Sequence, residues 1–310
     1  MAINWKIFGQ ADLLSRLERD LEMDRLSHAT LLVGPDKVGK HAVLNKMAQA
    51  LQCESGHCEL CTICQEIEGG RHLDTHVFEN DGSSIKIAEM RELKKFVALS
   101  KQGRHKLVII QNIERMTTPA ANSFLKMLEE PPVDVMFLLT TADQDSILPT
   151  IISRCRLYRA RLNSLDSITG FLLENYPGKE ESYVDRAALF AAGRVGKAID
   201  LMEDQELFDM YTAWYEELSA FEKQGDAVAL IKYAEQIAKL DKSVLKDFFW
   251  LFFHYIRYQL HECEDRAKKD QYADIGNLAQ RLSNEISRNV SARLALEVLF
   301  LRSFANFSKV

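Results

Sequence analysis

A glycine-rich loop between a short apolar run and an amphipathic segment constrains the fold of this chain more than any other feature. The run covers residues 30–33, and the loop at residues 34–40 reads Gly-Pro-Asp-Lys-Val-Gly-Lys. The next apolar residues recur at helical spacing and predict one helix face, made by Val43, Met47, Ala50 and Leu51. A strand, such a loop and a helix in this order predict a phosphate-binding loop, because backbone N–H groups at a helix N-terminus cradle phosphate oxygens.

Two more apolar runs, at residues 107–110 and 136–139, predict buried strands. Between them Thr118 is the predicted N-cap of a helix, Pro119 is its first residue, and a following pair of prolines ends it. Continuous apolar strands that alternate with helices predict a parallel sheet covered by helices on both faces. The fold class is therefore α/β, with a P-loop domain.

The composition changes along the chain. All six prolines lie at or before Pro177, and the segment that follows has helical periodicity throughout. We therefore predict a nucleotide-binding-like α/β domain at 1–162, a small helical lid domain at 163–205 and an all-α domain at 206–310.

Charge and hydropathy exclude several classes of function. The formal net charge is -6, so the chain is not expected to hold nucleic acid through its own field, and DNA contact should come through partners or one local patch. No apolar run approaches the roughly 20 residues that span a bilayer, so no membrane contact is expected. The first six residues lack the apolar core of a signal peptide, so the expected location is the cytoplasm.

Four of the six cysteines lie close together, in the pattern C-x4-C-x2-C-x2-C made by Cys53, Cys58, Cys61 and Cys64. In a cytosolic chain, such a cluster favours a metal site over a disulfide framework. Zinc takes four thiolates at tetrahedral corners, and short x2 turns let neighbouring cysteines face one centre. We predict a structural zinc site that is closed to substrate; the alternative is a set of incidental reduced thiols.

The phosphate loop departs from a working ATPase in its metal ligands. Gly34, Gly39 and Lys40 can bind phosphate, but His41 stands where Ser or Thr would bind Mg²⁺. The strand at 107–110 is followed by the neutral amides Gln111 and Asn112 in place of Asp and Glu. These departures predict a degenerate site that does not hydrolyse ATP, and they leave nucleotide binding itself open. Glu114 is acidic but lies beyond the end of this strand.

Several motifs occur in one order along the chain. Phe-Gly-Gln at 8–10 and His-Ala at 28–29 precede the glycine loop and the cysteine insert, and AANSFLKMLEEPP at 120–132 and LPTIISRC at 148–155 follow them. The chain thereby resembles the delta-prime family of bacterial DNA polymerase III clamp-loader subunits, in the AAA+ superfamily. The resemblance covers residues 1–205 well and the remainder only loosely, at 289–297. Within the first stretch, Glu129 and Glu130 end a predicted helix, which favours an exposed or interface-forming turn over catalytic carboxylates.

The resemblance implies an open ring of five subunits with ATP sites at the interfaces. Arg154, flanked by Ser153 and Cys155, is then expected to reach the ATP site of a neighbouring gamma/tau subunit as an arginine finger, because a guanidinium fits a γ-phosphate. The alternative for Arg154 is a surface arginine in an ion pair within its own domain. The implied partners are gamma/tau and delta subunits through the C-terminal collar domain, and the sliding clamp and primed DNA through the whole complex.

Two other functions remain open from the sequence. An active gamma/tau-like ATPase would share the zinc insert and the Ser-Arg-Cys motif, but it needs intact metal ligands and a sensor arginine. Gly196 occupies the position that matches this arginine, with Arg194 and Lys197 as possible substitutes. A stand-alone zinc-dependent DNA-binding protein is the third reading, and the acidic charge balance disfavours it.

Overall fold

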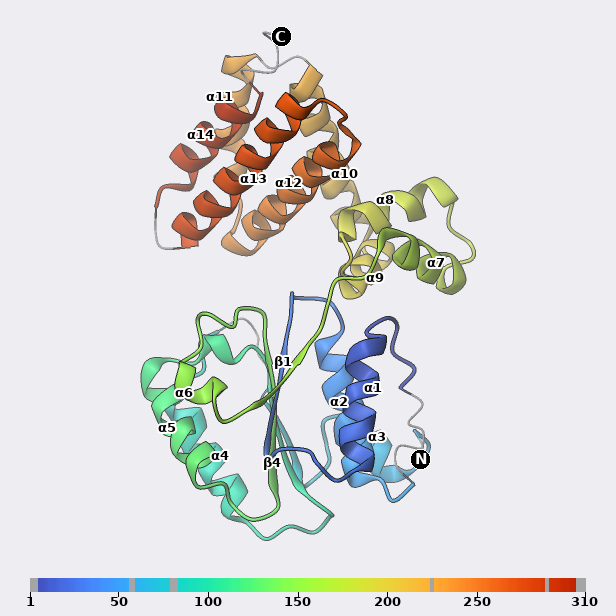
Figure 1. Cartoon of the computed structure of the whole chain (residues 1–310), viewed down its shortest axis with the longest axis vertical. Coiled ribbons are helices and arrows are strands. Elements are labelled where there is room, and N and C mark those ends of the chain that lie inside the picture. Colours follow the sequence, from blue (N-terminus) through green and yellow to red (C-terminus); the bar gives the residue numbers. More distant parts are fainter. Residues whose placement is uncertain (1–4, 56–58, 79–82, 224–225, 288–289, 305–310) are drawn as a thin grey trace. The chain divides into compact units, whose positions relative to one another are not determined.

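The computed structural model describes residues 5–55, 59–78, 83–223, 226–287 and 290–304. The chain divides into two compact units, of which the first comprises Met1–Phe171 with Gly193–Lys197, and the second comprises Leu172–Ala192 with Ala198–Val310. The first unit contains a sheet and the second is helical (Figure 1). The two domain boundaries predicted at residues 162 and 205 remain a prediction.

Five parallel strands form the sheet of the first unit, in the order β2-β3-β4-β1-β5. Their bounds are β1 Ala29–Val33, β2 Thr75–Phe78, β3 Lys106–Ile110, β4 Val135–Thr141 and β5 Arg156–Arg159. The three apolar runs of the sequence are the central strands β1, β3 and β4, which confirms the predicted parallel sheet. Every residue of β1 and β3 is buried, as continuous apolar runs require.

Helices cover both faces of this sheet (Figure 1). The helices on one face are α1 Ala11–Glu22, α2 Lys40–Gln52 and α3 Thr62–Glu68, and those on the other are α4 Ile87–Ala98, α5 Thr118–Glu129 and α6 Pro149–Ile152. Leu32 and Met47 are buried in the core of the first face, and Phe124 and Phe137 in that of the second. The N-cap of α5 is Thr117, so the predicted cap at Thr118 is wrong by one residue. Pro119 lies in the first turn, where its missing N–H has no helical partner to lose.

The rest of the described chain is helical. A short 3-10 turn, η1 Ile113–Arg115, follows β3, and the helices from residue 165 onward are α7 Leu165–Asn175, α8 Glu181–Ala191, α9 Val195–Glu203, α10 Gln205–Lys223, α11 Ala227–Ile237, α12 Lys242–Glu262, α13 Arg266–Ser287 and α14 Ala292–Phe304. Within the described ranges, no helix is both long enough and apolar enough to cross a membrane.

An aromatic core with one polar cluster holds the C-terminal helices together. Phe248, Phe252 and Phe300 are fully buried and contact one another. The Glu222 carboxylate of α10 accepts hydrogen bonds from the hydroxyls of Tyr255 in α12 and Tyr272 in α13. One carboxylate therefore links three helices at a partly buried site.

We expect Tyr255→Phe to lower the free energy of unfolding by about 1–2 kcal/mol, because it leaves Glu222 with one phenol donor fewer. Tyr258→Phe on the same helix is the matched control, since Tyr258 is exposed and should change stability little. Urea unfolding followed by circular dichroism measures both. Equal stability of the two variants would contradict a structural role for this carboxylate.

Candidate functional site

The phosphate loop connects β1 to α2, and close packing explains one of its glycines and backbone conformation the other. A side chain at Gly34 would place its Cβ 2.4 Å from the backbone oxygen of Ala160, just after β5. Gly39 has a φ of 99° and is the N-cap of α2, a left-handed conformation that glycine adopts without strain. The loop backbone therefore has the tight turn and the helix N-terminus that the sequence predicts.

Lys40 directs its ammonium into its own loop. Nζ donates hydrogen bonds to the carbonyl oxygens of Gly34 at 2.6 Å and Pro35 at 2.7 Å, and the side chain is 6% exposed. Burial lowers the pKa of Lys40, while the charges of Asp36 and Glu114 oppose this shift. The cation that would face phosphate oxygens in a filled loop is thus bonded to loop carbonyls here.

His41 and Gln111, the residues that the sequence analysis places where an active P-loop site has its metal ligands, contact each other. Nε2 of Gln111 lies 2.8 Å from Nδ1 of His41, and Nδ2 of Asn45 lies 3.1 Å from its Nε2. A neutral imidazole accepts at one ring nitrogen only, so one of these two amide nitrogens donates a hydrogen bond to the ring. These three side chains include no carboxylate or hydroxyl, the oxygen ligands that Mg²⁺ prefers.

Glu114 lies closer to the loop than its place in the sequence indicates. Asn112 adopts a left-handed conformation with φ 51°, and the following turn η1 brings Glu114 back toward the sheet. Oε1 of Glu114 accepts a hydrogen bond from the backbone N–H of Ala142 at 3.1 Å, and its charge raises the pKa of Lys40. Asn112 is the one sequence signal for this reversal, because asparagine tolerates the left-handed region.

The segment at 193–197 contacts the phosphate loop within the same unit. The backbone N–H of Gly196 donates to the oxygen of Lys37 at 2.7 Å, and a Cβ at Gly196 would lie 3.0 Å from that oxygen. At the position matched to a sensor arginine, the backbone of Gly196 therefore packs directly against the backbone of Lys37. Arg194 and Lys197, the two substitutes considered from sequence, are each 5% exposed.

Three of the four predicted zinc ligands come together, while Cys58 lies outside the described residues. The sulfurs of Cys53, Cys61 and Cys64 all lie within 4.8 Å of one another, and those of Cys53 and Cys61 are 3.8 Å apart. Thiolates at zinc–sulfur distances of about 2.3 Å in a tetrahedron would be roughly 3.8 Å apart. Soft sulfur donors at this spacing fit zinc.

Helix α2 supports the cysteine cluster from the end opposite the phosphate loop. Cys53 directly follows α2, and Nε2 of Gln49 donates to the Cys64 carbonyl at 3.0 Å. Glu59, between the second and third cysteines, accepts from Lys46 of α2 at 2.6 Å and also from Lys6. These hydrogen bonds lower the pKa of Glu59 to about 2, and the bond from Lys46 has the largest effect.

Arg154 lies at the turn between α6 and β5. Its Nη2 is 2.9 Å from Oε1 of Glu129, and its Nη1 donates to the Thr150 carbonyl at 2.9 Å. The ion pair within the domain, one of the two alternatives considered from sequence, is therefore present. On either side of Arg154, Ser153 bonds the same carbonyl and Cys155 packs against the core, where burial raises its thiol pKa to about 12.

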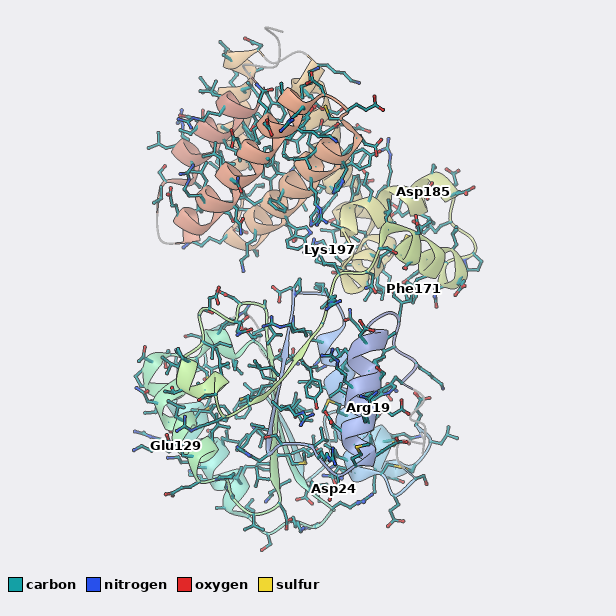
Figure 2. All side chains as sticks on the ribbon, in the orientation of Figure 1. Arg19, Asp24, Glu129, Phe171, Asp185 and Lys197 are labelled. Carbon is teal, nitrogen blue, oxygen red and sulfur yellow. The ribbon has the colours of Figure 1, made fainter. Side chains whose placement is uncertain are left out.

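Figure 2 shows Glu129, the last residue of α5, on one face of the sheet. Arg19 in α1 and Asp24 just after α1 lie on the other face. By the contacts given above, the predicted residues form three groups within the first unit: the loop with His41 and Gln111, the cysteine cluster, and Arg154. Their roles remain predictions. Sequence reasoning did not foresee the contacts of Glu114 and Glu129, because both join segments far apart in the chain.

The family model described as DNA polymerase III, delta subunit matches residues 9–163. The DNA polymerase III subunit delta' of Bacillus subtilis is 41% identical over 162 residues, which cover 50% of this chain and 49% of that protein. Subunit gamma of Buchnera aphidicola (subspecies Acyrthosiphon pisum) is 35% identical over 207 residues, covering 64% and 57%. The chain spans about half the length of the curated relatives it matches.

Among solved structures, a DNA polymerase III, gamma subunit-related protein from Thermotoga maritima matches with 20% identity and a TM-score of 0.43, covering 94% of this chain and 99% of that one. The RuvB Holliday junction branch migration motor of the same organism matches with 17% identity and a TM-score of 0.44, covering 66% and 64%.

We expect the purified chain to carry zinc and Cys61→Ser to lose most of it, because a serine hydroxyl replaces one thiolate donor. Cys263→Ser is the control, since Cys263 lies at the end of α12, outside the cluster. Metal analysis by mass spectrometry after native purification gives the zinc content of each. Wild-type protein without zinc, or equal zinc in the two variants, would contradict the site.

Proposed function

This chain belongs to the DNA polymerase III delta-subunit family, and on that premise we propose that it is a delta-prime-type clamp-loader subunit that hydrolyses no ATP itself. It supports ATP-dependent loading of the sliding clamp onto primed DNA and supplies an arginine finger to a neighbouring subunit. The observation that carries this proposal is the contact between His41 and Gln111 at the metal position.

Phosphoryl transfer depends on electrostatic stabilisation of charge on the transferred group. An imidazole bonded to a neutral amide holds Mg²⁺ poorly, and neither Gln111 nor Asn112 can take a proton from an attacking water. The Lys40 ammonium is already bonded to two loop carbonyls, so a nucleotide would have to break these bonds before it gained the cation. Each departure weakens catalysis by a separate physical route.

We propose that Arg154 acts outside its own domain. Its turn is partly exposed at the surface. Cys155 packs against the core and holds the backbone, and the Thr150 carbonyl accepts a hydrogen bond from Nη1 of the guanidinium. A guanidinium supplied in trans stabilises the charge that develops on a γ-phosphate. The proposed partners are gamma/tau and delta subunits in a five-membered ring in the cytoplasm, and structural zinc in the cysteine cluster maintains the fold of this subunit.

An active gamma/tau-like ATPase is the second candidate, and Glu114 is the observation that favours it. Burial lowers the pKa of Lys40, and the charge of Glu114 is one of two that oppose this shift, so an acidic group does act on the lysine of the loop. One oxygen of this carboxylate already accepts from Ala142, however, and Glu114 does not stand at either of the two acidic positions that directly follow the strand in a motor subunit.

We expect the isolated chain to release phosphate from Mg-ATP at the background rate, with or without primed DNA. Lys40→Ala should have the same rate, because no catalysis is present for the lysine to support. A coupled assay of ADP release measures both proteins. Mg²⁺-dependent turnover that Lys40→Ala abolishes would establish the gamma/tau-like alternative.

In the complex reconstituted with gamma/tau and delta subunits, Arg154→Ala should leave assembly intact and reduce DNA-stimulated turnover at the site it completes, by on the order of 10³-fold. The total ATPase rate of the complex then falls by the fraction that this one site contributes. Arg159→Ala is a control, because Arg159 is also an exposed arginine of the first unit. Size-exclusion chromatography and steady-state ATPase rates check the two effects, and unchanged turnover in Arg154→Ala would remove the finger role.

A further inference from the structure

The backbone that follows Arg154 is anchored to the rest of the first unit. Cys155 packs against the core, and Nη2 of Arg156 lies 2.6 Å from Oδ2 of Asp20 in α1. Asp20 also accepts the hydroxyl of Tyr158 in β5. The strand that follows Arg154 is therefore attached both to the core and to α1.

That side chain is held by contacts that a partner can reach. Glu129 bonds Nη2, and the Thr150 carbonyl and the Ser153 hydroxyl bond Nη1, at 2.9, 2.9 and 3.4 Å. The side chains of Arg154 and Glu129 are 34% and 49% exposed. Among the described residues, Nε of Arg154 has no hydrogen-bond acceptor. The guanidinium is thus oriented but not buried.

Glu129 lies at an unfavourable place for a carboxylate. It is the last residue of α5, and the carbonyl end of a helix repels negative charge. Arg154 offsets this repulsion, so the pair stabilises Glu129 as well as positioning the arginine. A partly exposed ion pair of this kind is weak. A γ-phosphate carries more charge and accepts two guanidinium N–H groups at once, so it can displace the carboxylate.

We propose that Glu129 is a latch that holds Arg154 against its own domain until a neighbouring subunit presents a nucleotide. The inference rests on the proposed arginine finger and adds a positioning residue to it. Glu129 withholds the guanidinium from an empty or misaligned interface, and ATP at a closed interface releases it. Turnover by the neighbour then depends on how strongly the latch competes with the phosphate.

Glu129→Gln in the reconstituted complex tests the latch. It keeps the side-chain shape and removes the charge, so turnover without DNA should rise by on the order of two- to five-fold at low salt. The rise should shrink at high salt, where the wild-type ion pair is screened. Glu130→Gln is the matched control, since it removes the adjacent charge, for which the structure records no ion pair with Arg154, and should behave as wild type.

Combination with Arg154→Ala separates failure of the latch from failure of the finger. If Glu129 acts through Arg154, the double variant should have the turnover of Arg154→Ala alone. Unchanged or lower turnover in Glu129→Gln, or a rise that survives in the double variant, would overturn the latch while a fall in Arg154→Ala leaves the finger standing. If Arg154→Ala itself has wild-type turnover, the proposed function fails and the latch fails with it.

Discussion

All five strands run in the same direction, so their carboxyl ends meet at one edge of the sheet. That constraint brings together residues that are far apart in sequence: the loop after β1, Gln111 after β3 and Ala142 after β4. The contacts of His41 with Gln111 and of Glu114 with Ala142 exist only because β3 lies beside β4 and β4 beside β1. An antiparallel arrangement would send half of these groups to the opposite edge.

At that edge several polar groups hydrogen-bond to other groups of the protein. The Lys40 ammonium donates hydrogen bonds to carbonyl oxygens of the loop, and side-chain amides contact the His41 ring. The Glu114 carboxylate accepts a hydrogen bond from a backbone N–H. An unpartnered buried polar group costs free energy, and these bonds reduce that cost. One group at this edge still bears it, because Oε2 of Glu114 is buried and has no hydrogen-bond partner among the described residues. Under the proposed function this loop is a scaffold without ATPase chemistry of its own, and Arg154 is the group by which the subunit takes part in the chemistry of a neighbour.

Much of this architecture was predictable, for identifiable reasons. The central strands β1, β3 and β4 are buried on both faces and therefore read as continuous apolar runs. The outer strands β2 and β5 have partly exposed residues, and Thr-His-Val-Phe and Arg-Leu-Tyr-Arg carry no comparable signal. Spacing alone indicated the cysteine cluster, because its ligands are neighbours in the chain. The pair of Arg154 with Glu129 could not be predicted in this way, since it depends on how α5 packs beside the turn before β5.

Helix α2 has a role that neither of its ends reveals alone. Its 13 residues begin with the lysine of the phosphate loop and stop one residue before the cysteine cluster, a rigid span of roughly 20 Å. Near the C-terminal end of α2, Lys46 and Gln49 hydrogen-bond to Glu59 and to the Cys64 carbonyl, both in the segment that contains the cysteines. The proposed zinc site and the phosphate loop are therefore built on the two ends of one helix, so α2 sets the distance between them.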